Sequence, residues 1–265
     1  MPPARKRPRA YDPAKTRKAV LAQFENVREA VGALSEEQLA SPTRLGEWTV
    51  RDLAAHLTMA VESVSRALER PAPPKAELNA LDYASATAAH ASAIAEGSHH
   101  LAEAHPDLAA RYADVERRIT DALEAAPQGR IIDTRAGGML LDDYLVTRTI
   151  ELVVHTDDLN AAVPGLDVPV DRTALATCVR VLADTLAARA PGGSTEVRIP
   201  PYAVVQCVEG PRHTRGTPPN VVETDPLTWI RLATGRTEWA AALDAAEVSA
   251  SGERADLSGL LPLMR

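Results

Sequence analysis

Apolar residues recur every three or four positions along the N-terminal half of the chain, which is the period of an amphipathic helix. In residues 13–34 these positions are Val20, Leu21, Phe24, Val27, Val31 and Leu34. Ser35 and Gln38 follow with the S-x-x-Q spacing of a capping box, which predicts the start of a short second helix. The chain is therefore expected to begin with one long helix and a turn into another.

Residues 45–57, LGEWTVRDLAAHL, predict a loop followed by a third helix. Thr49 and Asp52 have the residue types and spacing of a helix N-terminus. The PAPP run at residues 71–74 is expected to stop this helix, because proline cannot continue it. His56 lies on the apolar face, so its side chain is expected to point into the protein.

Further helical patterns cover residues 78–104, 106–126 and 140–162, with a short extended piece expected within 128–139. Long helices joined by short connections are typical of an up-and-down bundle. After residues 164–169 the pattern changes to short strands mixed with helices. Helices are expected at about 172–189, 226–234, 237–245 and 255–263, and strands at 195–199, 203–209, 221–224 and 247–251.

The expected fold class is therefore α+β, with a helical bundle followed by a small α+β domain. The expected boundaries are a basic, disordered tail at residues 1–12, the bundle at 13–165 and the second domain at 170–265. The chain of 265 residues is 45% hydrophobic and 25% charged, which is usual for a globular protein. Aromatic residues make up only 3%, so the core is expected to consist mainly of Ala, Leu and Val.

Charge and hydropathy exclude several classes of function. The formal net charge of −7 argues against a nucleic-acid partner, since the only basic cluster is in the first nine residues. No apolar run approaches the ~20 residues of a membrane span, and no hydrophobic segment of a secretory signal is present. Cys178 and Cys207 are expected to be reduced, buried thiols in a cytoplasmic protein.

Glu151 and His155 are the first candidates for chemistry. They are four residues apart on a predicted helix, so their side chains share one face. A carboxylate oxygen and an imidazole nitrogen at this spacing can bind one divalent ion, with His56 as a third ligand and one position left open. The alternative is that the histidines are ordinary core residues. The apolar neighbours of Glu151 favour the metal site, because a buried carboxylate needs a partner, and Asp157 or Asp158 could orient an imidazole.

The segments GEWTVRDLAAHL and TIELVVHTDDL resemble the two signature stretches of the mycothiol-dependent maleylpyruvate isomerase family, within the DinB-like helical bundles. The resemblance covers roughly residues 14–163. It implies that a divalent metal, with zinc as the first choice, binds to His56, Glu151 and His155. It further implies that mycothiol binds at the open position as a thiolate, because a neighbouring cation lowers the pKa of a thiol.

The resemblance implies an isomerase or a thiol transferase that acts on a small electrophilic substrate, although it assigns no residue to a catalytic step. Arg135 and Arg148 are candidate anion partners of the substrate, and the alternative for each is a surface salt bridge. The oligomeric state stays open, with a homodimer as one option.

The C-terminal residues from about 197 to 263 resemble a bacterial sterol-carrier-type domain, by the pattern DPLTWIRLATGR and the closing VSASGERADLSGLLPLM. Arg212, His213 and Arg215 lie in a polar loop and could contact an anionic ligand. The resemblance also suggests a second function. In it, the protein is a non-catalytic carrier that binds a lipid or small hydrophobic ligand in this domain.

Overall fold

The computed structural model describes residues 9–86, 90–210 and 218–264. They form two compact units. The helical unit comprises residues 14–178, and the sheet unit comprises residues 179 onward together with the segment before residue 14. No helix among the described residues is long and apolar enough to cross a membrane. Most of the expected basic tail lies outside the described residues, and Arg9, at its described end, pairs with Asp184 of the sheet unit at 2.9 Å.

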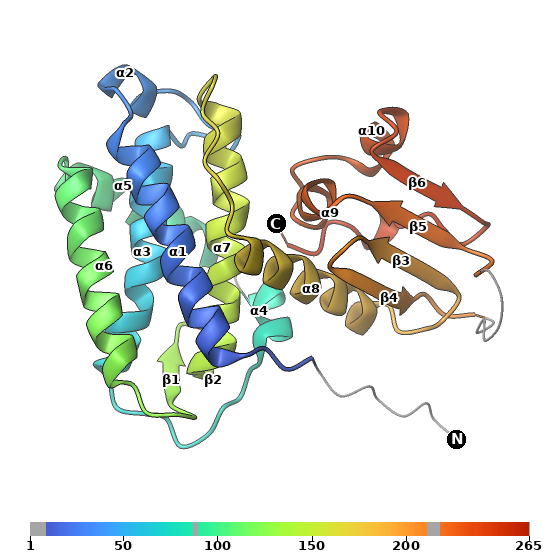
Figure 1. Ribbon diagram of the computed structural model, residues 1–265, viewed down its shortest axis with the longest axis horizontal. Coiled ribbons are helices and arrows are strands. Elements are labelled where there is room, and N and C mark those ends of the chain that lie inside the picture. Colours follow the sequence, from blue (N-terminus) through green and yellow to red (C-terminus); the bar gives the residue numbers. More distant parts are fainter. Residues whose placement is uncertain (1–8, 87–89, 211–217, 265) are drawn as a thin grey trace. The chain divides into compact units, whose positions relative to one another are not determined.

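The helical unit is an up-and-down bundle with one short hairpin (Figure 1). Its elements are α1 (Pro13–Gly32), α2 (Glu36–Leu39), α3 (Val50–Leu68), α4 (Ala80–Ala86), α5 (Ala91–Ala104), α6 (Leu108–Ala125), the antiparallel strands β1 (Ile131–Thr134) and β2 (Gly137–Leu140), and α7 (Leu141–Ala162). Helix α8 (Arg172–Arg189) begins in this unit and continues into the sheet unit.

Helix α3 lies at the centre of the bundle and packs against α5, α6 and α7. Its buried stripe includes Leu53, Leu57, Val61 and Val64. Phe24 of α1 stacks on Tyr112 of α6 with ring centroids 5.1 Å apart, which joins the first helix to the same core. The predicted helices of this unit are therefore confirmed and bury one continuous core, except that residues 78–104, predicted as one helix, form two, α4 and α5.

Helix starts agree with the expected caps. Ser35 and Thr49 each accept a hydrogen bond from the backbone N–H three residues later, and Gln38 and Asp52 bond back to complete the capping boxes. Asp171 accepts from the N–H groups at the start of α8. Each cap supplies a partner to N–H groups that a helix leaves unpaired at its start.

The sheet unit contains a four-stranded sheet in the order β4-β3-β5-β6. Its elements after α8 are β3 (Thr195–Ile199), β4 (Ala203–Cys207), β5 (Val221–Thr224), α9 (Pro226–Ala233), α10 (Trp239–Asp244), β6 (Val248–Ser251) and the 3₁₀ turn η2 (Ser258–Leu260). Strands β3 and β5 are parallel, and the other two pairs are antiparallel. Trp229 and Trp239 are buried in this unit.

The expected helix at residues 255–263 is wrong, because only the short turn η2 is present there. Leu261 is extended, with φ −108° and ψ 148°. The physical reason is Pro262, which lacks an N–H donor and disfavours a helical conformation in the residue before it. The expected ligand-contacting loop with Arg212, His213 and Arg215 lies outside the described residues.

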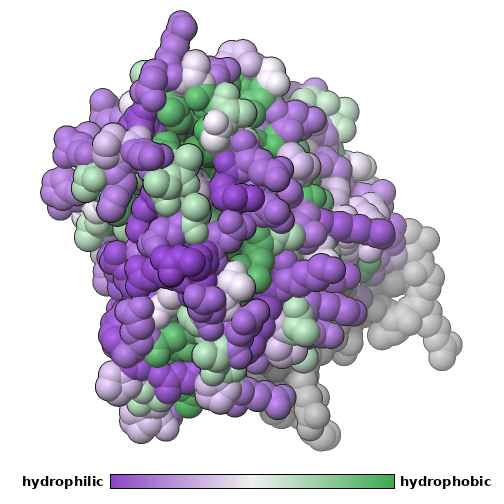
Figure 2. All heavy atoms as spheres, turned by 60° about the vertical axis from the view of Figure 1, so that its left-hand side comes forward, coloured by the Kyte–Doolittle hydropathy of each residue, from purple (hydrophilic) through white to green (hydrophobic). Residues whose placement is uncertain are grey.

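Polar residues cover most of the face shown in Figure 2, and apolar residues appear there in small separate patches. Among the described residues the large apolar side chains that are exposed are Leu140, Val204 and Leu243. These are isolated positions, as is usual at a protein surface. The chemistry of the chain is therefore best sought in its polar clusters.

Candidate metal centre

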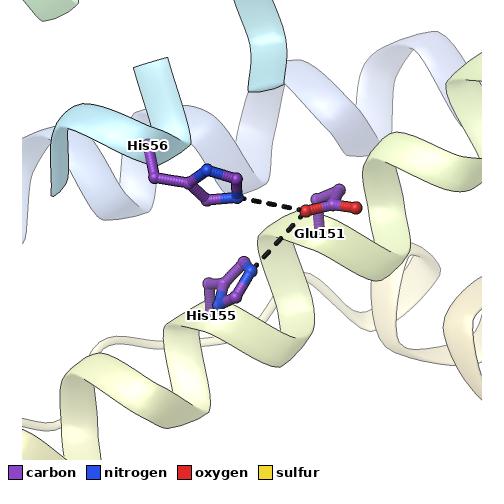
Figure 3. Close-up of side chains that lie close together, drawn as sticks. All are labelled: His56, Glu151 and His155. Atoms are coloured by element: carbon purple, nitrogen blue, oxygen red, sulfur yellow. Dashed lines mark hydrogen bonds and ion pairs between the residues drawn. The ribbon is translucent and has the colours of Figure 1, made fainter. Parts of the chain in front are cut away.

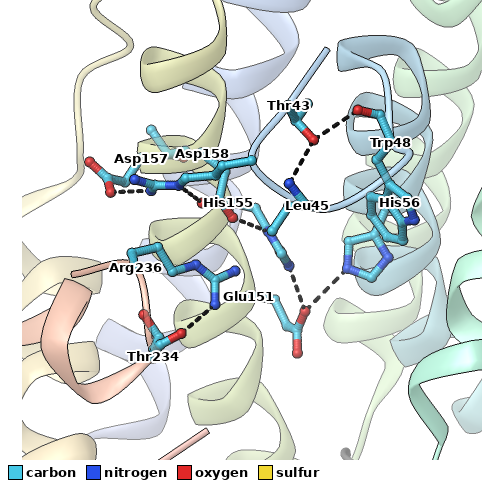
Figure 4. A network of polar contacts seen from close by, with 12 residues as sticks. Thr43, Leu45, Trp48, His56, Glu151, His155, Asp157, Asp158, Thr234 and Arg236 are labelled. Carbon is cyan, nitrogen blue, oxygen red and sulfur yellow. Dashed lines mark hydrogen bonds and ion pairs between the residues drawn. The ribbon is translucent and has the colours of Figure 1, made fainter. Parts of the chain in front are cut away.

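The loop before α3 and the start of that helix position His56. Gly46 has φ +67°, a conformation that glycine adopts without steric cost. The Thr43 hydroxyl donates to the Trp48 carbonyl at 2.9 Å, which closes the loop (Figure 4). The Trp48 ring then lies 5.1 Å from the His56 ring, and the Thr49 cap fixes the first turn of α3. His56 is buried and points from α3 toward α7.

Glu151 and His155 of α7 face His56 of α3 (Figure 3). Glu151 Oε2 lies 3.3 Å from His56 Nε2 and 3.6 Å from His155 Nε2. One ligand atom from each residue lies within 4.8 Å of the other two. Two ligands bound to one ion at about 2.0–2.2 Å with tetrahedral angles are about 3.4 Å apart. The two measured separations match that spacing, and they are longer than a good hydrogen bond.

The other ring nitrogen of each histidine has its own acceptor. His155 Nδ1 lies 2.8 Å from Asp158 Oδ2, and His56 Nδ1 lies 3.2 Å from Ser98 Oγ. The Ser98 hydroxyl donates to a helix carbonyl, so it accepts from His56. In neutral imidazoles these bonds place the proton on Nδ1 and leave both Nε2 lone pairs facing Glu151. Three acceptor atoms thus converge, and a cation between them would stabilise the arrangement.

The pKa values follow from burial and from these contacts. Burial acts to raise the pKa of Glu151, but its contacts with the two histidines and the charge of Arg148 hold it well below its usual range. Burial lowers the pKa of His56. Burial also acts to lower the pKa of His155, but the hydrogen bond with Asp158 and the nearby carboxylate of Glu151 outweigh it, so that this pKa is raised. At neutral pH Glu151 is therefore an anion.

Asp158 connects the cluster to the loop before α3. Its Oδ2 accepts from His155, while its Oδ1 accepts from Arg44 Nε at 2.6 Å. Arg44 also donates to Asp157 Oδ2 at 2.5 Å. The Asp158 side chain is fully buried and that of His155 is only 14% exposed. A buried carboxylate that holds an imidazole in one orientation is the usual outer contact of a metal-binding histidine.

The two arginines that the sequence suggested as anion partners of the substrate differ in their surroundings. Arg148 is buried in the bundle, so a surface salt bridge is the wrong interpretation of this residue. Arg135 is exposed in the turn between β1 and β2. The sequence interpretation missed three residues of the site. Arg44 lies in the loop before α3, Ser98 lies in α5 and Tyr83 lies in α4. Their contacts with the site arise only in the folded chain.

The family described as "Mycothiol maleylpyruvate isomerase N-terminal domain" matches residues 20–160, which include all three residues of the cluster. The chain belongs to this family. Residues 171–263 match the family described as "Bacterial SCP ortholog". The resemblances expected from the sequence motifs are thus confirmed for both parts of the chain.

Solved structures support the same fold. A mycothiol-dependent maleylpyruvate isomerase is 16% identical over 93% of this chain and 95% of the other, with a TM-score of 0.59. A point mutant of a mycothiol-dependent maleylpyruvate isomerase is 15% identical over the same shares, with a TM-score of 0.60. No curated protein matches the sequence. The isomerase-family fold, a helical bundle followed by a small α+β domain, is therefore confirmed.

Proposed function

We propose that the chain is a metal-dependent enzyme that uses mycothiol to isomerise a small electrophilic substrate or to transfer the thiol to it. The observation that carries the proposal is the convergence of one ligand atom each from His56, Glu151 and His155 within 4.8 Å. Family membership supports the thiol, since the solved relatives are mycothiol-dependent. Their substrate, maleylpyruvate, is the first one to test here.

The residues present fit a divalent ion. Two imidazole nitrogens and one carboxylate oxygen suit zinc, and three protein ligands are typical of a catalytic zinc site with one open position. When bound, such an ion would lower the pKa of a coordinated thiol and hold it as the nucleophilic thiolate. The side chains of Glu151 and His155 keep 14% exposure each, which supports access for a small thiol.

Other residues of the chain orient the candidate ligands. Asp158 and Ser98 orient the two imidazoles, so that both Nε2 atoms face the same point. The Trp48 ring packs beside the His56 ring, with centroids 5.1 Å apart. We place this chemistry in the cytoplasm, because the free and buried thiols of Cys178 and Cys207 are those of a reducing compartment.

The metal is tested first. The full chain, purified without chelators, is expected to contain about one divalent ion per chain, measured by elemental analysis. His155→Ala and Glu151→Gln should lose it, because two ligands hold a metal weakly. His100→Ala is the matched control, since His100 is an exposed histidine of the same unit. A wild-type chain without metal, or ligand variants that keep it, would contradict the proposal.

The reaction is tested next. Purified mycothiol is titrated into the metal-loaded chain by calorimetry, and maleylpyruvate is then added with mycothiol while its isomerisation is followed by absorbance. Thiol binding that depends on the metal supports the proposed use of mycothiol. Turnover of maleylpyruvate supports the isomerase, whereas formation of a stable thiol adduct supports the transferase. A metal-loaded chain that does not bind mycothiol would contradict the proposal.

A second candidate function is a carrier for a small hydrophobic ligand. It is favoured by a hollow of about 580 Å³ in the sheet unit, whose apolar lining residues include Leu232, Trp239, Leu243, Leu261 and Pro262. A fluorescent fatty-acid probe tests it, since binding at this hollow should change Trp239 fluorescence. Probe binding that Trp239→Ala abolishes, together with no thiol affinity, would favour the carrier.

A further inference from the structure

The two oxygens of Glu151 have different surroundings. Oε2 faces the Nε2 atoms of His56 and His155, whereas Oε1 accepts a hydrogen bond from the Tyr83 hydroxyl at 3.0 Å. Tyr83 belongs to α4 and is buried. The carboxylate is thus held from the side opposite the histidines. A carboxylate that is pinned at one oxygen has a fixed rotation about its last bond, so Oε2 cannot turn away from the histidines.

Arg148 in turn holds Tyr83. Its guanidinium donates to the Tyr83 hydroxyl, to the Thr147 hydroxyl and to the carbonyl of Ala60 in α3. The guanidinium carbon lies 5.1 Å from the centre of the Tyr83 ring and 4.4 Å from that of Tyr144. Arg148 is only 4% exposed. Its position between two rings and three hydrogen-bond acceptors leaves it little freedom to move.

The charge on Arg148 points to a role beyond packing. A buried cation is costly unless a negative group balances it. In the described part of the chain the hydrogen bonds of Arg148 go to uncharged groups. Glu151 lies three residues further along the same helix face, and Tyr83 bridges the two by donating to one and accepting from the other. Arg148 and Glu151 therefore form a charge pair with a tyrosine hydroxyl between them.

We propose that Tyr83 and Arg148 are positioning residues that fix Glu151 as a single-oxygen ligand, with Oε1 held by the tyrosine and Oε2 presented to the metal. The proposal rests on the proposed metal site. Its consequence is functional, because a glutamate free to turn could bind an ion through both oxygens. Pinning Oε1 limits the protein to three ligand atoms and keeps one position open for a thiol.

The test uses the full chain loaded with Co²⁺, whose visible absorption reports the number and geometry of its ligands. Tyr83→Phe removes the hydroxyl and keeps the ring beside Arg148. It is expected to weaken Co²⁺ binding by about 10–100-fold in a chelator competition, as for other outer contacts of metal ligands, and to change the visible spectrum. Arg148→Lys, which acts on the same hydroxyl from its other side, should change the spectrum in the same direction.

Tyr112→Phe is the matched control. It also removes a buried tyrosine hydroxyl from the bundle, one that donates to the Ala54 carbonyl of α3 at 2.8 Å. It should lower the free energy of unfolding without changing the Co²⁺ spectrum or affinity. Tyr83→Phe and Arg148→Lys variants that fold and bind Co²⁺ like the wild type would overturn the proposal and leave the metal site intact. A wild-type chain that binds no Co²⁺ would overturn the metal site itself.

Discussion

Arg44 and Asp158 join the loop before α3 to the last helix of the bundle through a 2.6 Å hydrogen bond. The same carboxylate accepts from His155 through its other oxygen. One buried side chain therefore fixes both the loop that carries Trp48 and an imidazole of the candidate metal centre. This double role explains why an aspartate with a fully buried side chain is stable there, since both of its oxygens have charged or polar partners.

Asp158→Asn is expected to weaken metal binding by about 10–100-fold, because an amide is a poorer acceptor for the His155 N–H and no longer fixes the proton on Nδ1. Chelator competition on the purified variant measures the effect. Asp157→Asn is the matched control, because it removes a neighbouring partner of Arg44 and leaves Asp158 in place. Equal affinities of the two variants would contradict an orienting role for Asp158.

Glu62 is the centre of a buried charge cluster away from the metal site. It accepts from Arg111 at 2.6 Å and from Arg118 at 2.8 Å. Glu62→Gln should lower the free energy of unfolding by about 3 kcal/mol, near the low end for breaking a buried ion pair, because the amide can still accept a hydrogen bond. Urea denaturation measures it. Glu69→Gln, which alters an exposed partner of Arg118, should cost about 0–1 kcal/mol, and a similar loss in both variants would contradict the expectation.

The same cluster should make stability depend on pH. Burial acts to raise the pKa of Glu62, but the hydrogen bond and charge of Arg111, with Arg66 and Arg118, outweigh it and lower this pKa below its ordinary value of 4.5. The folded state therefore binds this proton less readily than the unfolded state. The stabilisation is complete above pH 4.5 and is lost as the pH falls through the folded-state pKa.

The difference in unfolding free energy between the wild type and Glu62→Gln should accordingly shrink as the pH falls below 4.5. Urea denaturation at a series of acidic pH values checks it. A difference that stays constant, or one that grows in acid, would mean that Glu62 is not the group responsible.

The sequence predicted most of the bundle because its signals are local. The apolar period and the caps at Ser35 and Thr49 depend on residues a few positions apart, and the structure reproduces both. The helix predicted at residues 255–263 is wrong, because the apolar pattern does not include the effect of Pro262 on the backbone before it. Proline acts on the backbone directly, so it decides the conformation of Leu261 whatever the pattern around it.

The candidate site was only partly predictable, because the sequence signals are local and several contacts of the site are not. Glu151 and His155 share a helix face by their spacing, and the inward position of His56 on another predicted helix made it the candidate third ligand. The spacing also indicates that Arg148 lies near Glu151, because it is three residues earlier and hence on the same face of α7. Tyr83 and Arg44 lie in segments without any such spacing. Their contacts with Glu151 and Asp158 depend on how α4 and the loop before α3 pack on α7.

Thr49 should contribute more to stability than the equivalent cap at Ser35. Both side chains complete capping boxes, but α3 has 19 residues at the centre of the bundle whereas α2 has only 4. Thr49→Ala should lower the free energy of unfolding by about 1 kcal/mol, because the Asp52 N–H in the first turn of α3 loses its acceptor. Ser35→Ala should cost less, since water can replace its exposed hydroxyl. Thermal or urea denaturation compares the two variants, and an equal or larger loss for Ser35→Ala would show that the start of α3 is held by its packing rather than by its cap.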